Sequence, residues 1–301
     1  MKPVRIGTRG SSLARAQADQ VKAALHAAYQ DLPIEIVVIR TTGDQRTDVA
    51  LSQIGVKGLF VKEIEEALID GEIEMAVHSC KDLPADLQSG LFIVAALPRE
   101  DPRDALILAE RWKGIESWQQ LPNTAVIATG SARRRCQLRS LRPNFQFVDL
   151  RGNIDTRLRK LNAGEADAII LACAGLHRLQ LQSLISHPFP IDEMIPAVGQ
   201  GAVVVEMAAH NRELRELAAP LNDPKTEIAI KCERRFLAGM GGGCGLPMGA
   251  LAELQADGIV LKAMAAADEC SKPVTRSYIG AREMADQLGR LAAEDLHNQL
   301  V

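Results

Sequence analysis

The chain has few aromatic residues, because Phe, Trp and Tyr together make up 3% of its 301 positions. Its hydrophobic cores must therefore be built from Ala, Leu, Ile and Val, which favours helices alternating with buried parallel strands over an all-β sandwich. The chain also has no run of about 18 apolar residues, so we expect no membrane span. No long apolar stretch follows residues 1–5, so we expect no secretory signal and a cytoplasmic location.

The six cysteines are scattered, with no CxxC pair and no spacing typical of a metal site. In a chain of this size, such a pattern indicates reduced thiols rather than a disulfide framework. We therefore expect neither a structural disulfide nor a bound metal.

The chain has a small negative net charge, but its positive charge is concentrated in one segment. The net charge is −3, yet residues 133–160 contain nine basic residues against Asp149 and Asp155, which leaves this segment at +7 and the remainder at −10. A local excess of arginine in an acidic protein predicts a binding site for anions. The rival interpretation is a nucleic-acid interface, which the acidic net charge and the missing aromatic residues for base stacking disfavour.

Repeated strand–turn–helix patterns predict an α/β fold, and the length is too great for one ordinary core. The pattern restarts after a polar stretch at residues 98–104, and a buried strand at residues 202–207 is expected to cross back to the first half. From about residue 223 the pattern changes to α+β. We predict two doubly wound α/β domains and a smaller α+β third domain. Their boundaries are residues 1–98 with 200–219, residues 99–199, and residues 220–301.

The predicted helices cover residues 12–30, 59–70, 132–141, a segment starting near 153, 225–238 and 282–300. The predicted strands cover residues 4–7, 34–40, 73–78, 91–97, 105–108, 124–129, 145–149, 168–172, 202–207, 248–254, 259–267 and 274–279. Residues 41–57 show no clean period and are predicted as a long surface loop, of a kind that often forms a lid.

Two strand–turn–helix junctions share a design, residues 8–11 (TRGS) and residues 129–134 (TGSARR). Each places hydroxyl groups and free backbone N–H groups at a helix N-terminus, where anions are favoured, and adds arginine. Together they predict an anionic ligand held between the two α/β halves. For either junction alone, an equally good interpretation is that Ser11 and Ser131 are only helix caps.

Further arginines follow a strand in the basic segment. Arg151 lies just after a strand and Arg157 lies in the first turns of the next helix, at the edge of a parallel sheet where ligands usually bind. The side chains of Arg135, Arg139 and Arg142 are equally compatible with an ordinary surface position.

Lys81 and Asp82 sit at the end of a strand, just before Pro84. A carboxylate beside an ammonium group, near arginines, can act as an acid, a base or a stabiliser of positive charge. The alternative is a surface ion pair.

Residues 240–247 (MGGGCGLP) form the most unusual stretch of the sequence. Glycine disfavours helix and strand, so Cys244 is expected on an exposed loop, where a thiol can act as a nucleophile or as an attachment point. An exposed cysteine is more often inert, so this motif needs support from elsewhere.

Eight motifs supply that support, because they occur in the order seen in porphobilinogen deaminases: GTRGSSLA, GVKGLFVKE, AVHSCKDLP, REDPRDA, LRGNIDTRL, DAIILACAGLHRL, PAVGQGA and GGGCGLP. The sequence therefore resembles the porphobilinogen deaminase (hydroxymethylbilane synthase) family over nearly its whole length. The resemblance implies two domains like those of periplasmic anion-binding proteins, with the active site between them, and a third domain. It also suggests a monomer. Gly241 replaces the glutamate usual before GGC, which is expected to loosen that loop.

The activity implied by the resemblance is that of a transferase in haem and tetrapyrrole biosynthesis. Such an enzyme deaminates four porphobilinogen units, joins them head to tail on a dipyrromethane cofactor, and releases hydroxymethylbilane with water. The cofactor would be joined to Cys244 by a thioether. Asp82 would match the catalytic aspartate, which assists the loss of ammonia and stabilises the cationic azafulvene that follows.

The resemblance also assigns the other candidate site residues. Lys81 and Arg9 would support Asp82 in catalysis. The cofactor would be held by Thr129, Ser131, Arg133, Arg134, Arg151 and Arg157, together with Lys81 and Asp82. The substrate would be bound by Arg9, Ser11, Gln17, Lys57, Phe60, Arg151, Arg178 and Gln200. An alternative function, a non-catalytic anion-binding protein of the same two-lobed fold, would require neither Cys244 nor Asp82. Porphobilinogen is the expected partner, with no nucleic acid and no membrane.

Overall fold

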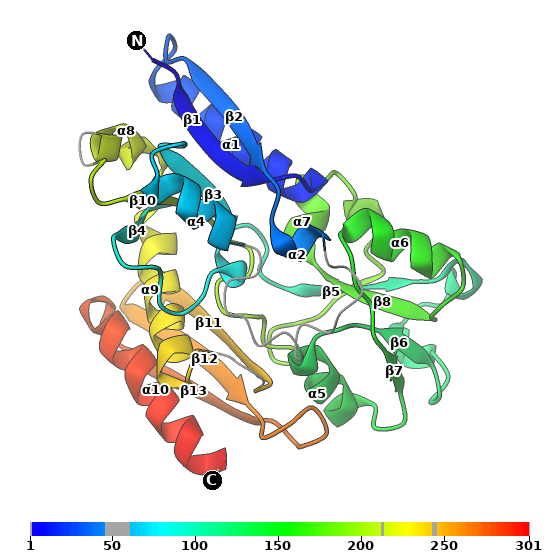
Figure 1. Ribbon diagram of the computed structural model, residues 1–301. Coiled ribbons are helices and arrows are strands. Elements are labelled where there is room, and N and C mark those ends of the chain that lie inside the picture. The colour runs from blue at the N-terminus through cyan, green and yellow to red at the C-terminus, as the bar shows by residue number, and fades with distance from the viewer. Residues whose placement is uncertain (1, 46–60, 212–213, 243–245, 301) are drawn as a thin grey trace. The chain divides into compact units, whose positions relative to one another are not determined.

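The computed structural model describes residues 2–45, 61–211, 214–242 and 246–300 (Figure 1). The chain divides into two compact units. Unit 1 comprises Met1–Glu100 and Ala202–Lys231, and unit 2 comprises Asp101–Gly201 and Cys232–Val301. No helix in the described part of the chain is long and apolar enough to cross a membrane.

Unit 1 contains a five-stranded sheet in the order β2-β1-β3-β10-β4. Its strands are β1 (Val4–Arg9), β2 (Ile34–Ile39), β3 (Met75–Ser79), β4 (Leu91–Ala96) and β10 (Val203–Ala208). β1 runs parallel to β2 and β3, whereas β10 is antiparallel to both β3 and β4. Every residue of β10 is buried. The prediction that this strand crosses back to the first half is confirmed.

Helices cover both faces of this sheet. α1 (Ser12–Ala28) buries Ala18, Val21 and Leu25 against one face, and α4 (Lys62–Ile69) buries Ile64 and Leu68 against the other. Both helices place apolar residues three or four apart, the spacing that forms one helical face. The shorter α8 (Arg215–Ala218) and the first part of α9 (Pro224–Gly239) complete unit 1.

Two details differ from the expected pattern in this unit. The expected turn at residues 8–11 begins later, because β1 continues to Arg9, which pairs with Ile39. The predicted loop at residues 41–57 begins with a helical turn, α2 (Thr42–Gln45), and the rest of it lies outside the described residues. A single helical turn is too short to show a hydrophobic period.

Unit 2 contains a second five-stranded sheet in the order β7-β6-β8-β5-β9. Its strands are β5 (Asp104–Leu108), β6 (Val126–Ala128), β7 (Gln146–Val148), β8 (Ala168–Ala172) and β9 (His187–Pro188). β6 is parallel to β7 and β8, and β5 is antiparallel to β8 and β9. The helices are α5 (Ala132–Leu141), α6 (Ile154–Asn162) and α7 (Cys173–Arg178).

The third sheet also belongs to unit 2 and is an antiparallel meander of β11 (Met248–Gln255), β12 (Gly258–Ala265) and β13 (Val274–Gly280). α10 (Ala285–Leu300) packs on β12 and β13. The backbone N–H of Ala250 donates to the carbonyl of Pro196, which ties this sheet to the preceding segment. The α/β class with an additional α+β part is therefore confirmed, while the three domain boundaries remain a prediction.

Candidate functional site

A pocket in unit 1 opens at the carboxyl ends of β1 and β3, where ligands bind in sheets of this kind. Six polar residues contribute to its lining, and four of them were predicted from the sequence as site residues. The predicted ones are Arg9, Ser11, Gln17 and Asp82, and the others are His78 and Ser79. The structure therefore brings together residues that are up to 73 positions apart in the chain.

The start of α1 positions two of these side chains. Ser11 is the N-cap of α1, and its hydroxyl accepts a hydrogen bond from the backbone N–H of Ala14 at 3.2 Å. Gln17, six residues after Ser11, is buried and donates through Nε2 to the hydroxyl of Ser79 at 2.8 Å. The cap interpretation of Ser11 is thus confirmed, and its contact with a ligand remains a prediction.

A short 3₁₀ turn, η1 (Cys80–Asp82), directs Lys81 and Asp82 outward from the end of β3. The backbone N–H of Cys80 donates to the carbonyl of Ala202 at 3.0 Å, and Leu83 is buried below the turn. Lys81 and Asp82 themselves are exposed. The pocket thus combines the Asp82 carboxylate with the Arg9 guanidinium, one group suited to developing positive charge and one suited to a substrate carboxylate.

In unit 2, the predicted junction lies at the start of α5, at the carboxyl end of β6. The hydroxyl of Ser131 caps α5 and accepts from the backbone N–H of Arg134 at 3.4 Å. The hydroxyl of Thr129 accepts from the backbone N–H of Ser131 at 3.3 Å. The cap interpretation of Ser131 is thus confirmed. The hydroxyl groups of Thr129 and Ser131 each accept a backbone hydrogen bond, and the ligand contacts predicted for them remain predictions.

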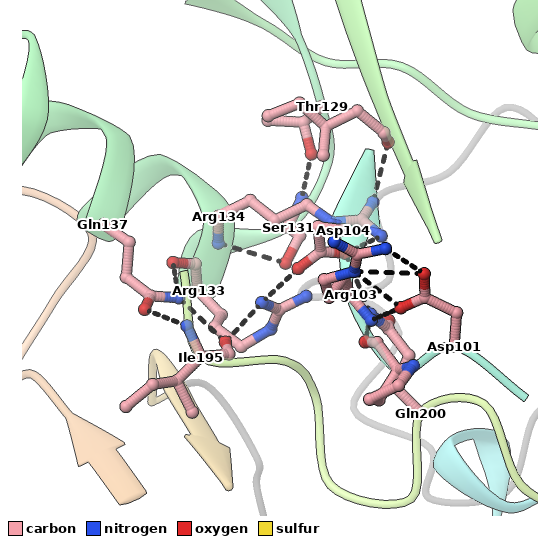
Figure 2. A network of polar contacts seen from close by, with 12 residues as sticks. Asp101, Arg103, Asp104, Thr129, Ser131, Arg133, Arg134, Gln137, Ile195 and Gln200 are labelled. Carbon is pink, nitrogen blue, oxygen red and sulfur yellow. Dashed lines mark hydrogen bonds and ion pairs between the residues drawn. The ribbon is translucent and has the colours of Figure 1, made fainter. Parts of the chain in front are cut away.

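Asp104, the first residue of β5, is the centre of a buried ionic network (Figure 2). One carboxylate oxygen lies 2.7 Å from Nη1 of Arg133, and the other lies 2.7 Å from Nη2 of Arg134. Nε2 of Gln200 donates to the same carboxylate at 3.0 Å and to the carbonyl of Pro102 at 2.7 Å. Asp104 is fully buried, and the two arginines are 6% and 7% exposed.

The charges of this network do not cancel. Burial alone would raise the pKa of Asp104, but the charges of Arg133 and Arg134 outweigh it and hold that pKa well below its usual range. Burial lowers the pKa of Arg133, while the charge of Asp104 opposes this effect. Two guanidinium groups against one carboxylate leave one excess positive charge, so the network favours an anion nearby.

Two arginines that were predicted to bind a ligand form hydrogen bonds within the protein in this network. Arg134 uses Nε and Nη2 on Asp104 and Nη1 on the carbonyl of Ile170. Arg133 directs Nη1 to Asp104 and to the carbonyl of Ile195. Direct binding of a cofactor by these groups remains a prediction. The sequence interpretation missed Asp104, because the polar residues 98–104 look like a linker, and only the DPRDA motif marks the position.

The remaining arginines predicted at the site are half-buried in unit 2. Arg151 follows β7, and Arg157 in α6 donates through Nε to the carbonyl of Gly152 at 2.8 Å. Arg178 in α7 donates through Nη2 to the carbonyl of Gly201 at 2.9 Å. Because β6, β7 and β8 are parallel neighbours, the segments after them start from one edge of the sheet. Arg151 and Arg157 therefore come from the same edge as Ser131.

The other basic residues of α5 and its end make structural contacts. Arg135 donates to the carbonyl of Thr129 at 2.8 Å and forms an ion pair with Asp149. Arg139 donates to the carbonyl of Glu269, and Arg142 donates to the carbonyl of Leu121. These half-buried side chains join segments within unit 2, so they are not ordinary exposed surface residues, and whether they contact a ligand remains a prediction.

Cys244, Lys57 and Phe60 lie outside the described residues, so their predicted roles remain predictions. The structure does describe the turn that leads to Cys244. Gly241 and Gly242 follow α9 with φ angles of 81° and 75°, and the N–H of Gly242 donates to the carbonyl of Leu237 at 2.9 Å. This is a glycine C-cap, a conformation that L side chains rarely adopt.

The buried thiols are poor candidates for a covalent attachment. Cys80, Cys136, Cys173 and Cys232 are buried, and Cys270 is exposed. Burial raises the pKa of Cys136 to about 11 and the pKa of both Cys173 and Cys232 to about 12. A thiol that stays protonated at neutral pH is a weak nucleophile. Within the described residues, no group of three or more His, Cys, Asp or Glu side chains is arranged to hold a metal ion.

Comparison with known proteins gives a consistent result. Residues 4–216 match the family described as porphobilinogen deaminase, dipyromethane cofactor binding domain, and residues 227–298 match the porphobilinogen deaminase C-terminal domain. A porphobilinogen deaminase of Syntrophomonas wolfei is 44% identical over 299 residues, which cover 99% of this chain and 96% of the relative. One of Roseiflexus sp. strain RS-1 is 47% identical over 296 residues, which cover 95% and 96%.

Among solved structures, the periplasmic VFT2 domain of Bordetella pertussis BvgS aligns with a TM-score of 0.44 and 13% identity, over 72% of this chain and 86% of that one. The family matches cover most of the chain, and the relatives are similar over nearly their full length. The chain therefore belongs to the porphobilinogen deaminase family.

Proposed function

We propose that this chain joins four porphobilinogen units head to tail on a dipyrromethane cofactor attached to Cys244, with loss of ammonia, and releases hydroxymethylbilane by hydrolysis. The observation that carries the residue assignments is the pocket of unit 1, in which Arg9, Ser11, Gln17 and Asp82 converge. Family membership supports the activity and the cofactor. A non-catalytic anion-binding protein, the alternative, receives no support from the relatives.

The residues of unit 2 fit a dipyrromethane group, whose two rings carry carboxylate side chains. The network around Asp104 has one excess positive charge, and Arg151 and Arg157 add two further guanidinium groups on the same edge of the sheet. Paired N–H groups of arginine match the geometry of a carboxylate. When bound, the cofactor supplies the nucleophilic pyrrole carbon to which the first substrate is joined.

We assign the reaction at the substrate to the pocket of unit 1. Arg9 binds a substrate carboxylate, and Asp82 faces the positive charge that develops on the pyrrole as the aminomethyl carbon–nitrogen bond breaks and ammonia leaves. The aminomethyl carbon would then be joined to the free α-carbon of the pyrrole chain. Asp82, the carboxylate that lines this pocket, would accept the proton that this α-carbon loses.

We also propose that the protein is a cytoplasmic monomer that binds neither nucleic acid nor membrane. The five cysteines of the described residues form no disulfide and four of them are buried, which supports the cytoplasmic location. The acidic net charge of −3 and the low aromatic content argue against a nucleic-acid partner. Light scattering on the purified protein at several concentrations tests the monomer, and a mass twice that of the chain would contradict it.

The experiment that tests the cofactor assignment is the intact mass of the purified protein. We expect an excess over the polypeptide equal to two deaminated porphobilinogen units, absent from Cys244→Ser and retained in Cys270→Ser, which removes the exposed thiol elsewhere. An excess that survives Cys244→Ser would move the attachment to another residue. A bare mass that stays bare after incubation with porphobilinogen would favour the non-catalytic alternative.

A further inference from the structure

Three buried ionisable side chains gather in unit 1 beside the pocket. His78 on β3 and Glu206 on β10 come from neighbouring antiparallel strands, and Nε2 of His78 lies 3.2 Å from Oε2 of Glu206. α4 packs on both strands and contributes Glu65. The exposed fractions are 4% for His78, 0% for Glu206 and 6% for Glu65. Burial, and then the charge of Glu206, raises the pKa of Glu65, so the three groups form one electrostatic cluster.

The polar atoms of this cluster are poorly satisfied. Nε2 of His78, both carboxylate oxygens of Glu206 and Oε1 of Glu65 are buried and form no hydrogen bond with any described residue. His78 and Glu206 are thus close enough for an ion pair but are not oriented for a hydrogen bond. Buried polar groups are normally hydrogen-bonded, and a buried ion pair is often no more stable than apolar side chains in its place. Stability alone therefore does not explain the cluster.

His78 connects the cluster to the pocket, because it is also one of the residues that line the pocket. The next residue, Ser79, is held from the α1 side, where its hydroxyl exchanges hydrogen bonds of 2.8 Å and 3.1 Å with the Gln17 amide. The end of β3 is thus fixed by α1 through Ser79 and by β10 and α4 through His78. η1, which carries Asp82, begins at the following residue.

We propose that the His78–Glu206 pair, supported by Glu65, is a positioning device that fixes the end of β3 and so keeps the Asp82 carboxylate in the pocket. His78 is a positioning residue, since it acts through Asp82. The charged groups that surround it are Glu206 on β10, Glu65 on α4, and Arg9 and Asp82 in the pocket. The inference rests on the role proposed above for Asp82.

The decisive variant is His78→Gln in the full-length, cofactor-loaded protein, because glutamine keeps a donor but removes the imidazole. We expect kcat to fall on the order of ten- to a hundredfold, the effect of a small displacement of a reacting group, with KM for porphobilinogen changed less than about threefold. The intact mass should still show the cofactor. In His78→Gln/Glu206→Gln, two neutral amides that can hydrogen-bond to each other replace the imidazole and the carboxyl group, so part of the lost kcat should return.

A double-mutant comparison with Asp82 shows whether His78 acts by positioning Asp82 or independently of it. In an Asp82→Asn background, His78→Gln should reduce kcat much less than it does in the parent protein. If the two losses multiply, His78 does not act through Asp82 and the inference is wrong. If Asp82→Asn alone leaves kcat unchanged, the role proposed for Asp82 is wrong instead. Glu206→Gln provides the same comparison should His78→Gln not fold.

Glu74→Gln is the matched control. Glu74 immediately precedes β3 and pairs with Arg5 of β1, with Oε1 2.6 Å from Nη2, away from the strand end that carries His78. This variant should lower the urea midpoint of unfolding and leave kcat unchanged. If His78→Gln gives the same result, a lower midpoint with full kcat, the cluster has only a structural role and the inference fails.

Discussion

Asp104 holds three side chains that the sequence marked as candidates for ligand binding. Charge patterning predicted that the arginines of residues 133–160 form a binding site for anions. The anion that the structure shows beside Arg133 and Arg134 is this carboxylate, and the binding of an anionic ligand remains a prediction. A pairing between residues about 30 positions apart depends on the register of β5 and the start of α5. Spacing in a single sequence does not contain that information, so the arginines were predictable and their partner was not.

Removing the Asp104 carboxylate should strongly destabilise the folded protein. Asp104→Asn leaves two guanidinium groups buried without a counter-ion, so we expect the free energy of unfolding to fall by about 3–5 kcal/mol. Urea denaturation followed by circular dichroism measures the change. The control is Asp101→Asn, because its partner Arg103 is 41% exposed and such pairs contribute about 1 kcal/mol or less. Equal losses in the two variants would contradict the central place given to Asp104.

At the scale of elements, the helices and strands with a clear period were predicted well. α5 has the predicted bounds, Ala132–Leu141, and α1 ends two residues earlier than expected, at Ala28. The directions of β5 and β10 were not predicted, and both are antiparallel to neighbours in otherwise parallel sheets. A fully buried strand reads as a continuous apolar run in either direction, so its orientation is set by tertiary pairing and not by its own sequence.

The C-cap of α9 allows a test at this scale. Gly241 has a φ of 81° with open space around the position of a Cβ atom, and so does Gly90 with a φ of 88°. Gly241→Ala and Gly90→Ala should therefore each cost about 1 kcal/mol of unfolding free energy for backbone reasons alone. Intact mass should show reduced cofactor occupancy only in Gly241→Ala, because Cys244 follows that turn. Equal occupancy in both would show that the turn does not control attachment.

For the molecule as a whole, some site residues could be predicted from the sequence and others could not, for a physical reason. In unit 1, four predicted residues meet in one pocket, because the ends of parallel strands share an edge and local motifs mark those ends. The buried residues His78, Glu206 and Asp104 were not predicted as site residues, since each is a single polar residue within an apolar strand or a polar linker. The residues that they contact are set by tertiary packing, which their local sequence does not show.

The response of folding to pH also belongs to the whole molecule. Burial opposes the ionisation of several carboxyl groups, but arginine or hydrogen-bond partners outweigh burial and lower the pKa of each. These groups are Glu74, Asp101, Asp104 and Asp167. Their contribution is present at neutral pH and is lost as the pH falls through these lowered pKa values, so stability should decline below about pH 4.

Glu65 has the opposite sign, because its pKa is raised by burial and by Glu206. Ionisation of Glu65 therefore destabilises the folded state, and this loss of stability grows as the pH rises from the ordinary pKa of the carboxyl group through its raised pKa in the folded protein. Glu65→Gln should therefore gain stability relative to the parent protein as the pH rises from about 4 towards neutrality. Urea midpoints across that range measure this, with exposed Glu66→Gln as the control. A constant difference at every pH would contradict the prediction.

The place of β10 has a consequence for the order in which the protein is made. This strand lies between β3 and β4, yet it is encoded after all of residues 101–201. At the usual speed of translation of about 5–20 residues per second, the ribosome needs roughly 5–20 s to deliver those residues. During that time β3 and β4 are already synthesised with an edge that lacks its partner, the arrangement most exposed to aggregation and to capture by chaperones.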